Sequence, residues 1–342
     1  MWDGQGLTIM TDAPTATPRP FSSQRRRRVA RTLLASGILC AGAASMFPGL
    51  GWLPGMIAEI AAQALLVSLP FAVVWAVRRR WACAAASSVA CVLLASALLQ
   101  PRAPFTPGSG EKTIRVLALN GGPENEHPDE LLKLLTFVKA EVVALVEPNP
   151  GLVRGIRRHG ALDASFPHGA ARGPVSHLTS WRLVLSEFPV LDTDENRTVK
   201  DLLSVVVRHP SGEFGMVVVH PSSPRSPSRW REGNELIDRA LSEARRLESQ
   251  GYPTLIIGDL NSTPTGHRSR LLARGGYLRC KPLRAPIGTF PAWSVWPAMA
   301  AIDDACASPG WRVRSWRTIR GGGSDHRGVL IELVIPPRPA PR

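Results

Sequence analysis

The chain has 342 residues and a hydrophobic share of 44%, which fits one or two globular domains. Its 41 Lys and Arg against 27 Asp and Glu give a formal net charge of +14. A mean hydropathy near zero with 20% charged residues excludes a mainly disordered chain. Nine Arg and three acids give residues 1–100 a charge of +6, and residues 101–342 carry the other +8. Because residues 32–100 are almost free of charge, a purely cytosolic enzyme is also excluded.

The first hundred residues contain three long apolar runs without a charged side chain. A helix rises about 1.5 Å per residue, so roughly 20 apolar residues cross the hydrocarbon core of a membrane. We therefore predict a membrane anchor over residues 25–100, with three transmembrane helices near 32–50, 58–77 and 81–100. A soluble domain of buried helices is the alternative, and it is disfavoured because such helices rarely lack a polar face.

Arginines cluster before the first run, at positions 25–28 and 31, and between the second and third runs, at positions 78–80. The turn at residues 51–57 has no Lys or Arg. The positive-inside rule then places both clusters in the cytoplasm, and an odd number of spans places residues 101–342 outside. We expect a multi-pass protein of the cell membrane with its larger domain extracellular. A cleaved signal peptide is the alternative for the first run.

The other segments are predicted from their composition. Residues 1–24 are rich in Thr, Pro, Ser and Gly and are expected to form a disordered cytoplasmic tail. Residues 101–110 are expected to be a linker, residues 111–335 the outer domain, and residues 336–342 a disordered end. Glu59 lies near a span end, where an interfacial snorkelling role is favoured over a proton path.

Two of the five cysteines, Cys280 and Cys306, lie in the outer domain. An extracellular location allows a disulfide between them, but two cysteines do not decide the matter. The other three lie in predicted spans, where they act as small apolar residues.

The outer domain alternates predicted strands and helices, which indicates an α/β fold. Continuous apolar runs of this kind suit strands that are buried on both faces. We predict strands over residues 114–119, 142–146, 183–186, 202–207, 214–219, 254–258 and 329–334, and helices over 128–140 and 230–250. Antiparallel pairs are expected among residues 183–219.

Polar side chains recur where these strands end. Strand-ending positions hold Asn120, Glu147, His220, Asp259 and Asn261, and the final strand is preceded by Asp325 and His326. Each of these residues alone is more often a turn or loop residue than a functional one. Chemistry gathers where strand ends meet loops, so their common placement favours a single site.

These residues occur in short strings that resemble the endonuclease/exonuclease/phosphatase superfamily of metal-dependent phosphoesterases. The strings are LN at 119–120, ALVE at 144–147, LSEFP at 185–189, VH at 219–220, GDLN at 258–261, AID at 301–303 and SDH at 324–326. The resemblance implies a two-sheet, four-layer α/β sandwich that hydrolyses phosphoric esters or diphosphates. Three spans before such a domain further resemble actinobacterial teicoplanin-resistance membrane proteins.

The residue types fit a divalent cation. Cleavage of a phosphoester benefits from a cation that neutralises phosphate oxygens, and Mg²⁺ prefers hard oxygen ligands while keeping several waters. Glu147 is the principal candidate ligand, Asn120 can add a neutral oxygen, and Asp325 is a third candidate. We expect Mg²⁺, with Mn²⁺ as a substitute. No Cys or His spacing resembles a zinc site.

The resemblance also implies roles for the other site residues. In the family, the Asp of the GDxN string orients or deprotonates water, and the Asn holds a phosphate oxygen, which assigns these roles to Asp259 and Asn261. His326 is expected to bind phosphate and share proton transfer, with Asp303 orienting its imidazole. His220 is expected to donate to a phosphate oxygen or to the leaving group.

The sequence departs from the family pattern in three places. Pro221 follows His220 where Leu is frequent, Asp304 stands where His or Tyr is frequent, and Gly121 and Gly122 follow Asn120. At the third place the DNA-repair branch of the family has an Asp two residues after the Asn, which this sequence lacks, so a role in DNA repair is less supported.

An extracellular site would meet lipid carriers and phospholipid head groups rather than DNA. We expect the lipid bilayer and a lipid-linked phosphate or pyrophosphate of cell-wall synthesis as partners, with a role in teicoplanin resistance and no nucleic acid. Three arginines beyond His220 are candidates for a second phosphate contact or for a solvated helix start: Arg225, Arg229 and Arg231. The alternatives are an extracellular nuclease and an inactive membrane-binding module. The oligomeric state is left open.

Overall fold

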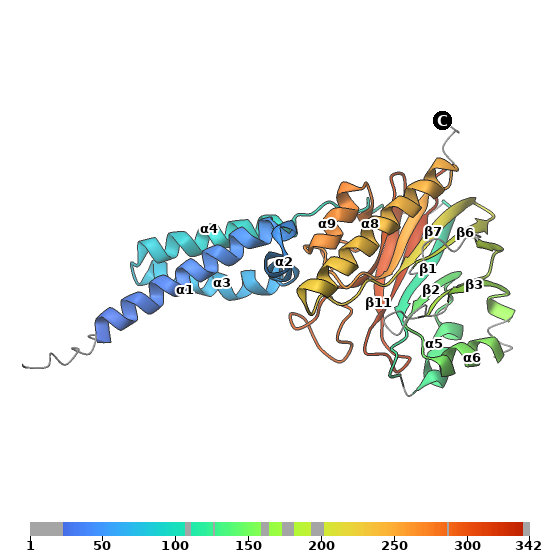
Figure 1. The fold of residues 1–342 in the computed structure, drawn as a ribbon, viewed down its shortest axis with the longest axis horizontal. Coiled ribbons are helices and arrows are strands. Elements are labelled where there is room, and N and C mark those ends of the chain that lie inside the picture. The colour runs from blue at the N-terminus through green and yellow to red at the C-terminus, as the bar shows by residue number, and fades with distance from the viewer. Residues whose placement is uncertain are drawn as a thin grey trace, which may run out of the picture.

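The computed structural model describes residues 23–106, 111–125, 127–158, 164–172, 181–192, 202–285 and 287–337. A helical bundle lies at one end of the molecule and a two-sheet domain at the other (Figure 1). The predicted disordered segments 1–24 and 336–342 lie almost wholly outside the described residues, as does the second half of the predicted linker.

The bundle contains α1 (Ser23–Met46), a short 3-10 turn (Pro48–Leu50), α2 (Trp52–Glu59), α3 (Ala61–Val77) and α4 (Trp81–Leu98). Two segments are long and apolar enough to cross a membrane, Gln24–Met46 and Trp81–Leu98. The pair α2 and α3 would count as a third only if taken together, because the two helices meet at an angle of 74°. The prediction of one continuous span over 58–77 is therefore corrected: the helix breaks at Ile60, and α2 ends against the two-sheet domain.

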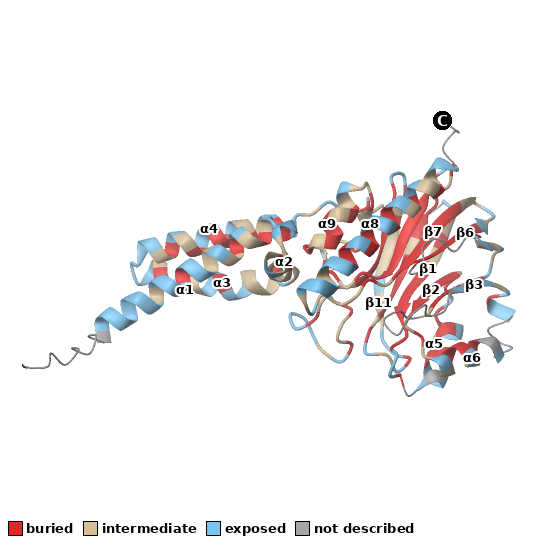
Figure 2. Cartoon of the chain, in the orientation of Figure 1, coloured by how far each residue is buried: buried red, intermediate tan, exposed pale blue. Residues whose placement is uncertain are grey.

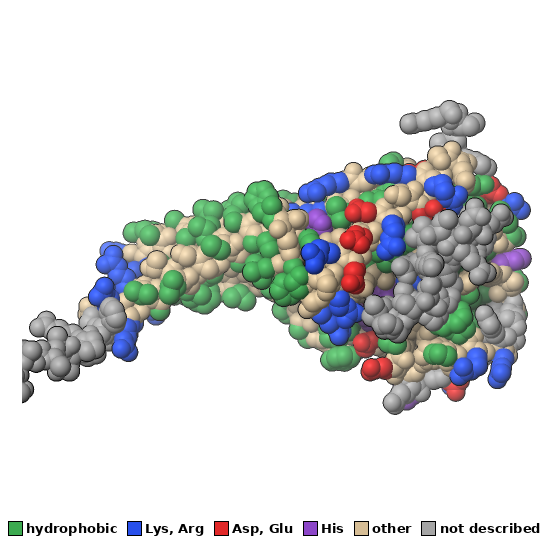
Figure 3. Space-filling view, in the orientation of Figure 1, with side chains coloured by type: hydrophobic (Ala, Val, Ile, Leu, Met, Phe, Trp, Pro, Cys, Tyr) green, Lys and Arg blue, Asp and Glu red, His purple; other side chains and the backbone are tan. Residues whose placement is uncertain are grey.

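Small residues let the bundle helices approach closely. A Cβ on Gly42 of α1 would lie 2.9 Å from the Cα of Ala90 on α4, so glycine is needed at this crossing. Ala61, Leu94 and Ala97 pack in the interior near the domain. Large apolar side chains point outward, and they cover the surface of the bundle in Figure 3. A bundle with an apolar exterior suits a lipid surrounding.

The domain is built from two mixed six-stranded sheets. The first has the order β11-β12-β1-β2-β4-β3, and the second has the order β5-β6-β7-β8-β10-β9. The strands of the first sheet are β1 (Thr113–Asn120), β2 (Val142–Val146), β3 (His168–Arg172), β4 (Arg182–Ser186), β11 (Arg312–Ile319) and β12 (Gly328–Val334). Those of the second are β5 (Val190–Asp192), β6 (Leu202–His209), β7 (Gly212–Val219), β8 (Thr254–Asp259), β9 (Leu278–Arg279) and β10 (Asp303–Ala307).

Helices cover both outer faces of the sheets. The main core fills the space between the sheets, with Val116, Val218 and Ile331 among its fully buried residues. A second core lies under α5 (Pro128–Phe137) and α6 (Pro150–Arg158), and a third under α8 (Pro227–Ser249) and α9 (His267–Arg274). The buried strands and helix faces are red in Figure 2. The predicted two-sheet α/β sandwich is confirmed.

All seven predicted strands and both predicted helices are present, with boundaries shifted by a few residues. The sequence pattern did not reveal β10 and β11, because β10 begins with two buried acids and β11 alternates charged with apolar residues at a sheet edge. Cys280 and Cys306 are both buried and free, so the disulfide is absent. The first half of the predicted linker pairs with the domain, since the amide of Ala103 donates to the carbonyl of Arg279.

Strand register brings the polar strand ends together. β1 and β2 run parallel, as do β7 and β8, so Asn120 and Asp259 lie at the carboxyl ends of their sheets. β10 runs antiparallel to β8 and pairs Asp303 directly with Asp259. β12 runs antiparallel to β1, which brings the preceding residue His326 to the same edge. One edge of the sandwich therefore collects the site.

Candidate active site

Asn120 joins two carboxylates from different sheets. Its Nδ2 atom donates to Oε2 of Glu147 at 3.0 Å and to Oδ2 of Asp259 at 3.2 Å. Its Oδ1 atom accepts the amide hydrogen of Gly122 at 2.9 Å. Glu147 itself has φ of +52°, an uncommon left-handed conformation that places its side chain at the end of β2. The two acids are therefore neighbours in one site.

The GDLN turn is built for close approach. Gly258 has φ of +140°, and a Cβ there would lie 2.2 Å from the carbonyl oxygen of Val219. The Oδ1 atom of Asp259 accepts the amide hydrogen of Asn261 at 2.8 Å, which closes the turn. Asn261 has φ of +46°, and its Nδ2 atom donates to the carbonyl of Pro221 at 3.0 Å. The turn holds both side chains beside His220.

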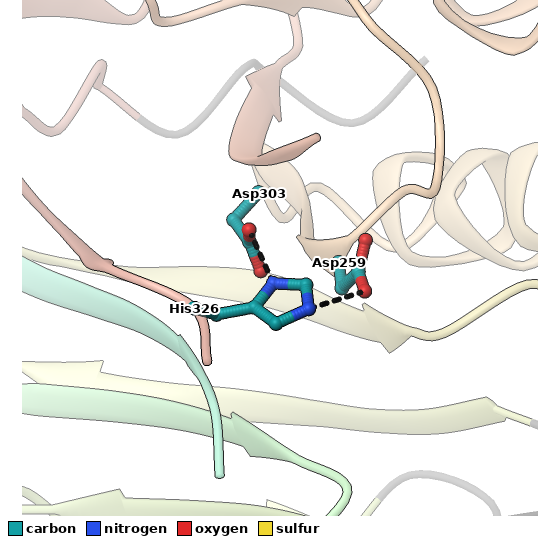
Figure 4. A group of neighbouring side chains, drawn as sticks. All are labelled: Asp259, Asp303 and His326. Atoms are coloured by element: carbon teal, nitrogen blue, oxygen red, sulfur yellow. Dashed lines mark hydrogen bonds and ion pairs between the residues drawn. The ribbon is translucent and has the colours of Figure 1, made fainter. Parts of the chain in front are cut away.

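His326 lies between two aspartates (Figure 4). Its Nδ1 atom is 2.8 Å from Oδ2 of Asp303, and its Nε2 atom is 3.9 Å from Oδ2 of Asp259. The hydroxyl of Ser324 accepts the His326 amide hydrogen at 3.0 Å and donates to the carbonyl of Asn120 at 2.7 Å. The Phe290 ring lies 4.8 Å from the imidazole centroid. The imidazole is thus held at Nδ1 by Asp303 and contacted by one aromatic ring, that of Phe290.

The charges of this cluster follow from its burial and its partners. Burial alone lowers the pKa of His326, but the carboxylates of Asp303, Asp259 and Asp325 raise it to about 10. Burial raises the pKa of Asp259, but hydrogen bonding to His220 and the charge of His326 hold it well below the usual value. Burial raises the pKa of Asp303. At neutral pH the imidazole is therefore cationic and Asp259 is ionised.

His220 lies across the site from His326. Its Nε2 atom is 3.4 Å from Oδ2 of Asp259, and its Nδ1 atom is 3.6 Å from Oε1 of Glu147. The Asn261 amide approaches the same Nε2 atom at 3.3 Å. Two imidazoles thus approach one carboxylate oxygen, Oδ2 of Asp259.

A cavity of about 640 Å³ opens over these residues. Six of the eight predicted site residues line it: Glu147, His220, Asp259, Asn261, Asp325 and His326. Asn120 and Asp303 stand behind them and contact them through the hydrogen bonds described above. Arg225 and Arg229 also line the cavity, whereas Arg231 is not among the described residues that do so.

The oxygen donors fit a divalent cation. Glu147, Asp259 and Asp325 present carboxylates to the same cavity, and hard oxygen donors of this kind suit Mg²⁺. Asp259, Asp303 and His326 also offer ligand atoms within 4.8 Å of one another. In that set, however, Oδ2 of Asp303 and Nδ1 of His326 are already hydrogen-bonded to each other. Glu147 lines the cavity whereas Asp303 stands behind it, so Glu147 is the carboxylate that faces a cation bound there.

Several supporting residues carry no sequence signal. The buried Arg268 donates to the carbonyls of Leu260 and Asn261 at 3.1 Å each, and so holds the GDLN turn from behind. Burial lowers the pKa of Arg268 to about 10, which leaves it charged at neutral pH. The hydroxyl of Thr289 accepts the Asp303 amide hydrogen at 3.1 Å. Long-range contacts of this kind become visible only in the fold.

Asp304, which departs from the family pattern, has a structural contact. Its Oδ2 atom accepts from Nε of Arg279 at 3.0 Å, and its Oδ1 atom accepts from the indole of Trp316 at 3.0 Å. Asp304 and Arg279 are both buried. Neighbouring aspartates therefore serve different ends, since Asp303 faces the imidazole and Asp304 faces a guanidinium.

The sandwich fold and the carboxylate–imidazole cluster at its edge define a class of hydrolases that act on phosphoesters. Residues 117–326 match the model of the Endonuclease/Exonuclease/phosphatase family, and the chain belongs to this family. A comparison of the chain with curated proteins found no match.

Solved structures share the fold at low sequence identity. An endonuclease/exonuclease/phosphatase from Beutenbergia cavernae is 18% identical with a TM-score of 0.51, over 67% of this chain and 73% of that one. A functionally unknown conserved protein from Enterococcus faecalis is 18% identical with a TM-score of 0.53, over 65% and 100% of the two chains. Sphingomyelinase C from Streptomyces griseocarneus is 15% identical with a TM-score of 0.46, over 65% and 99%. The first two support the fold and nothing finer.

Proposed function

We propose that the protein is a membrane-anchored, divalent-metal-dependent phosphoesterase that acts outside the cytoplasm on a lipid-linked phosphate or pyrophosphate. The observation that carries the proposal is the convergence of Glu147, Asp259 and His326 in one cavity of a chain whose N-terminal helices are long and apolar enough to span a membrane.

The residues of the cavity divide the chemistry. The cationic His326 presents Nε2–H to the cavity, where it donates to a phosphoryl oxygen or to the departing oxygen. Asp303 accepts a hydrogen bond from Nδ1 and so holds the ring in this orientation. The ionised Asp259 accepts a hydrogen bond from the attacking water and orients it toward phosphorus. Asn261 and His220 contact the remaining phosphoryl oxygens.

A metal ion fits the same proposal. Glu147, with Asn120 and Asp325, would hold the cation, which supplies charge neutralisation at the phosphate oxygens when bound. The amide of Asn120 keeps the Glu147 and Asp259 carboxylates side by side despite their mutual repulsion. A cation would replace part of that hydrogen bonding.

The arginine clusters support an extracellular domain. The arginines in the first turns of α1, and those of the turn between α3 and α4, lie at the end of the bundle remote from the domain (Figure 3). The positive-inside rule assigns that end to the cytoplasm, so the domain lies on the opposite side.

An exposed apolar loop beside the cavity supports a lipid-linked substrate. Trp293 lines the cavity and is 70% exposed, and Val295 is 72% exposed. The side chain of Gln63 on α3 donates to the carbonyl of Pro297 at 2.9 Å, so this loop reaches the bundle. Exposed tryptophans suit the membrane interface. A phosphate on a membrane lipid would meet the cavity there.

One substrate panel tests the proposal. Full-length protein in lipid nanodiscs with Mg²⁺ is offered a polyprenyl diphosphate, a phospholipid and plasmid DNA. We expect phosphate release from the diphosphate and its loss in Glu147→Ala and His326→Ala. Nicking of the plasmid at equal enzyme would favour a nuclease instead. Turnover of none of the three, with no metal affinity, would favour a binding module.

Cleavage of a wall-precursor carrier would alter cell-wall synthesis, and a change in teicoplanin susceptibility belongs to the same proposal. Expression of the wild-type chain and of Glu147→Ala in a susceptible host separates the enzymatic effect from an effect of the anchor alone.

A further inference from the structure

One acidic side chain of the bundle reaches into the domain. Glu59 is the last residue of α2, and the sequence predicted it to be an interfacial, snorkelling residue. The structure corrects that prediction, because the Glu59 carboxylate binds the domain. Oε1 accepts from the hydroxyl of Ser262 at 2.7 Å, and Oε2 accepts a short hydrogen bond from the Thr263 amide. The Glu59 carbonyl also accepts from the Thr263 hydroxyl at 3.0 Å.

The segment that Glu59 binds begins one residue after Asn261. Two buried guanidinium groups hold the carbonyl groups of this segment: Arg268 binds those of Leu260 and Asn261, and Arg279 binds that of Ser262 at 2.7 Å. Glu59 binds the donors of the same segment, an amide and a hydroxyl. The domain therefore holds the carbonyl groups of this segment, and the membrane bundle accepts hydrogen bonds from its amide and hydroxyl groups.

Gly266 gives independent support for this contact. A Cβ on Gly266 would lie 1.9 Å from Oε1 of Glu59, so the carboxylate occupies space that a side chain would need. One residue earlier, the Thr265 hydroxyl donates to the carbonyl of Ala58 at 2.5 Å. The end of α2 and the start of α9 therefore pack closely against each other.

The contact matters because the adjoining turn is strained. Asn261 adopts φ of +46°, and a non-glycine residue keeps such a conformation only when its surroundings enforce it. Both Asp259 and Asn261 must point at the phosphoryl group for catalysis. A displacement of about 1 Å at such a group can cost about 100-fold in rate.

We propose that Glu59 is a positioning residue, through which the membrane bundle holds the Asp259–Asn261 turn in its catalytic geometry. The inference rests on the proposed function of that turn. It makes the bundle a part of the active site's support as well as a membrane attachment.

The test uses full-length protein in nanodiscs with a soluble aryl phosphodiester and Mg²⁺. Glu59→Gln keeps the shape but places an amide NH2 group toward one of the two donors, the Ser262 hydroxyl or the Thr263 amide. We expect kcat to fall at least tenfold with KM unchanged within twofold. Ser262→Ala removes one of the carboxylate's bonds and should lower kcat by a smaller factor. The matched control is Trp52→Phe, which removes another bundle–domain hydrogen bond, to the Pro224 carbonyl at 2.8 Å. It should keep kcat within twofold.

Hydrogen–deuterium exchange gives a readout independent of turnover. In Glu59→Gln, amides of residues 260–266 should exchange faster while those of β1 stay protected. Unchanged kcat in Glu59→Gln, or a loss of protection throughout both sheets, would overturn the positioning role. If the wild-type chain cleaves no substrate, the proposed function fails, and unchanged exchange at 260–266 would separately refute the contact with Glu59.

Discussion

The Nδ1 atom of His326 lies 2.8 Å from Oδ2 of Asp303, and both residues are buried at the edge where the two sheets meet. This hydrogen bond orients the imidazole, so its Nε2 atom faces the cavity and the carboxylate of Asp259. The next residue along β10, Asp304, faces the opposite way and binds Arg279. Two neighbouring aspartates therefore have different partners, an imidazole for Asp303 and a guanidinium for Asp304.

Asp303→Asn should remove the orienting charge while keeping the side-chain size. We expect kcat to fall by about 10²–10⁴-fold, because the imidazole loses the carboxylate that orients it and much of its positive charge. The variant should also lose stability, because the cationic imidazole loses its nearest carboxylate, so kcat is compared for the folded fraction. Steady-state kinetics with a soluble phosphodiester measure the effect, and wild-type kcat in this variant would contradict the assignment.

Asp304→Asn should act on stability. The variant leaves the Arg279 guanidinium buried without its carboxylate, and breaking a buried ion pair costs about 3–5 kcal/mol. We expect a lower midpoint of denaturant unfolding and a kcat close to wild type for the folded fraction. A variant with normal stability would show that Arg279 finds other acceptors.

The raised pKa of His326 predicts a dependence of stability on pH. The imidazole has a pKa of about 10 in the folded chain and about 6.5 when unfolded, so folding favours its protonated form. The resulting stabilisation is complete below pH 6.5 and is lost as pH rises toward 10. Thermal unfolding with EDTA should therefore show the stability difference between wild type and His326→Asn shrinking over this window. A difference that is constant from pH 6.5 to 10 would exclude the raised pKa.

Metal binding should depend on Glu147. We expect EDTA to abolish turnover, Mg²⁺ to restore it, and Glu147→Gln to weaken the metal affinity about 10–100-fold, because the amide lacks the negative charge. Glu124 lines the same cavity and offers a matched control. Isothermal titration with Mn²⁺ measures both variants, and equal losses in the two would indicate a general electrostatic effect.

The apolar loop should act on lipid substrates alone. Replacement of Trp293 and Trp296 by Ala removes side chains suited to the membrane interface. Burial of one such side chain in the membrane would favour binding by on the order of 1–3 kcal/mol. We expect KM for a lipid diphosphate in vesicles to rise about tenfold and KM for a soluble ester to stay unchanged. Equal effects on both substrates would place the loop in phosphate binding instead.

Local pattern in the sequence was enough for the apolar helices, the buried strands and the polar residues at strand ends. Continuous runs such as residues 142–146 and 254–258 suit strands buried on both faces, and polar side chains recur directly after them. The matching strings then indicated the family, and all eight predicted side chains lie in or directly behind one cavity.

Tertiary structure alone decided how that site is supported. Arg268, Arg279 and Asp304 are buried charged residues, and the sequence around them gives no sign of the partners that they bind in the fold. Glu59 looked like a membrane-interface acid because its partners lie 203 and 204 residues away. Burial of a charge depends on partners that the fold brings from distant positions, and a periodic pattern carries no information about them.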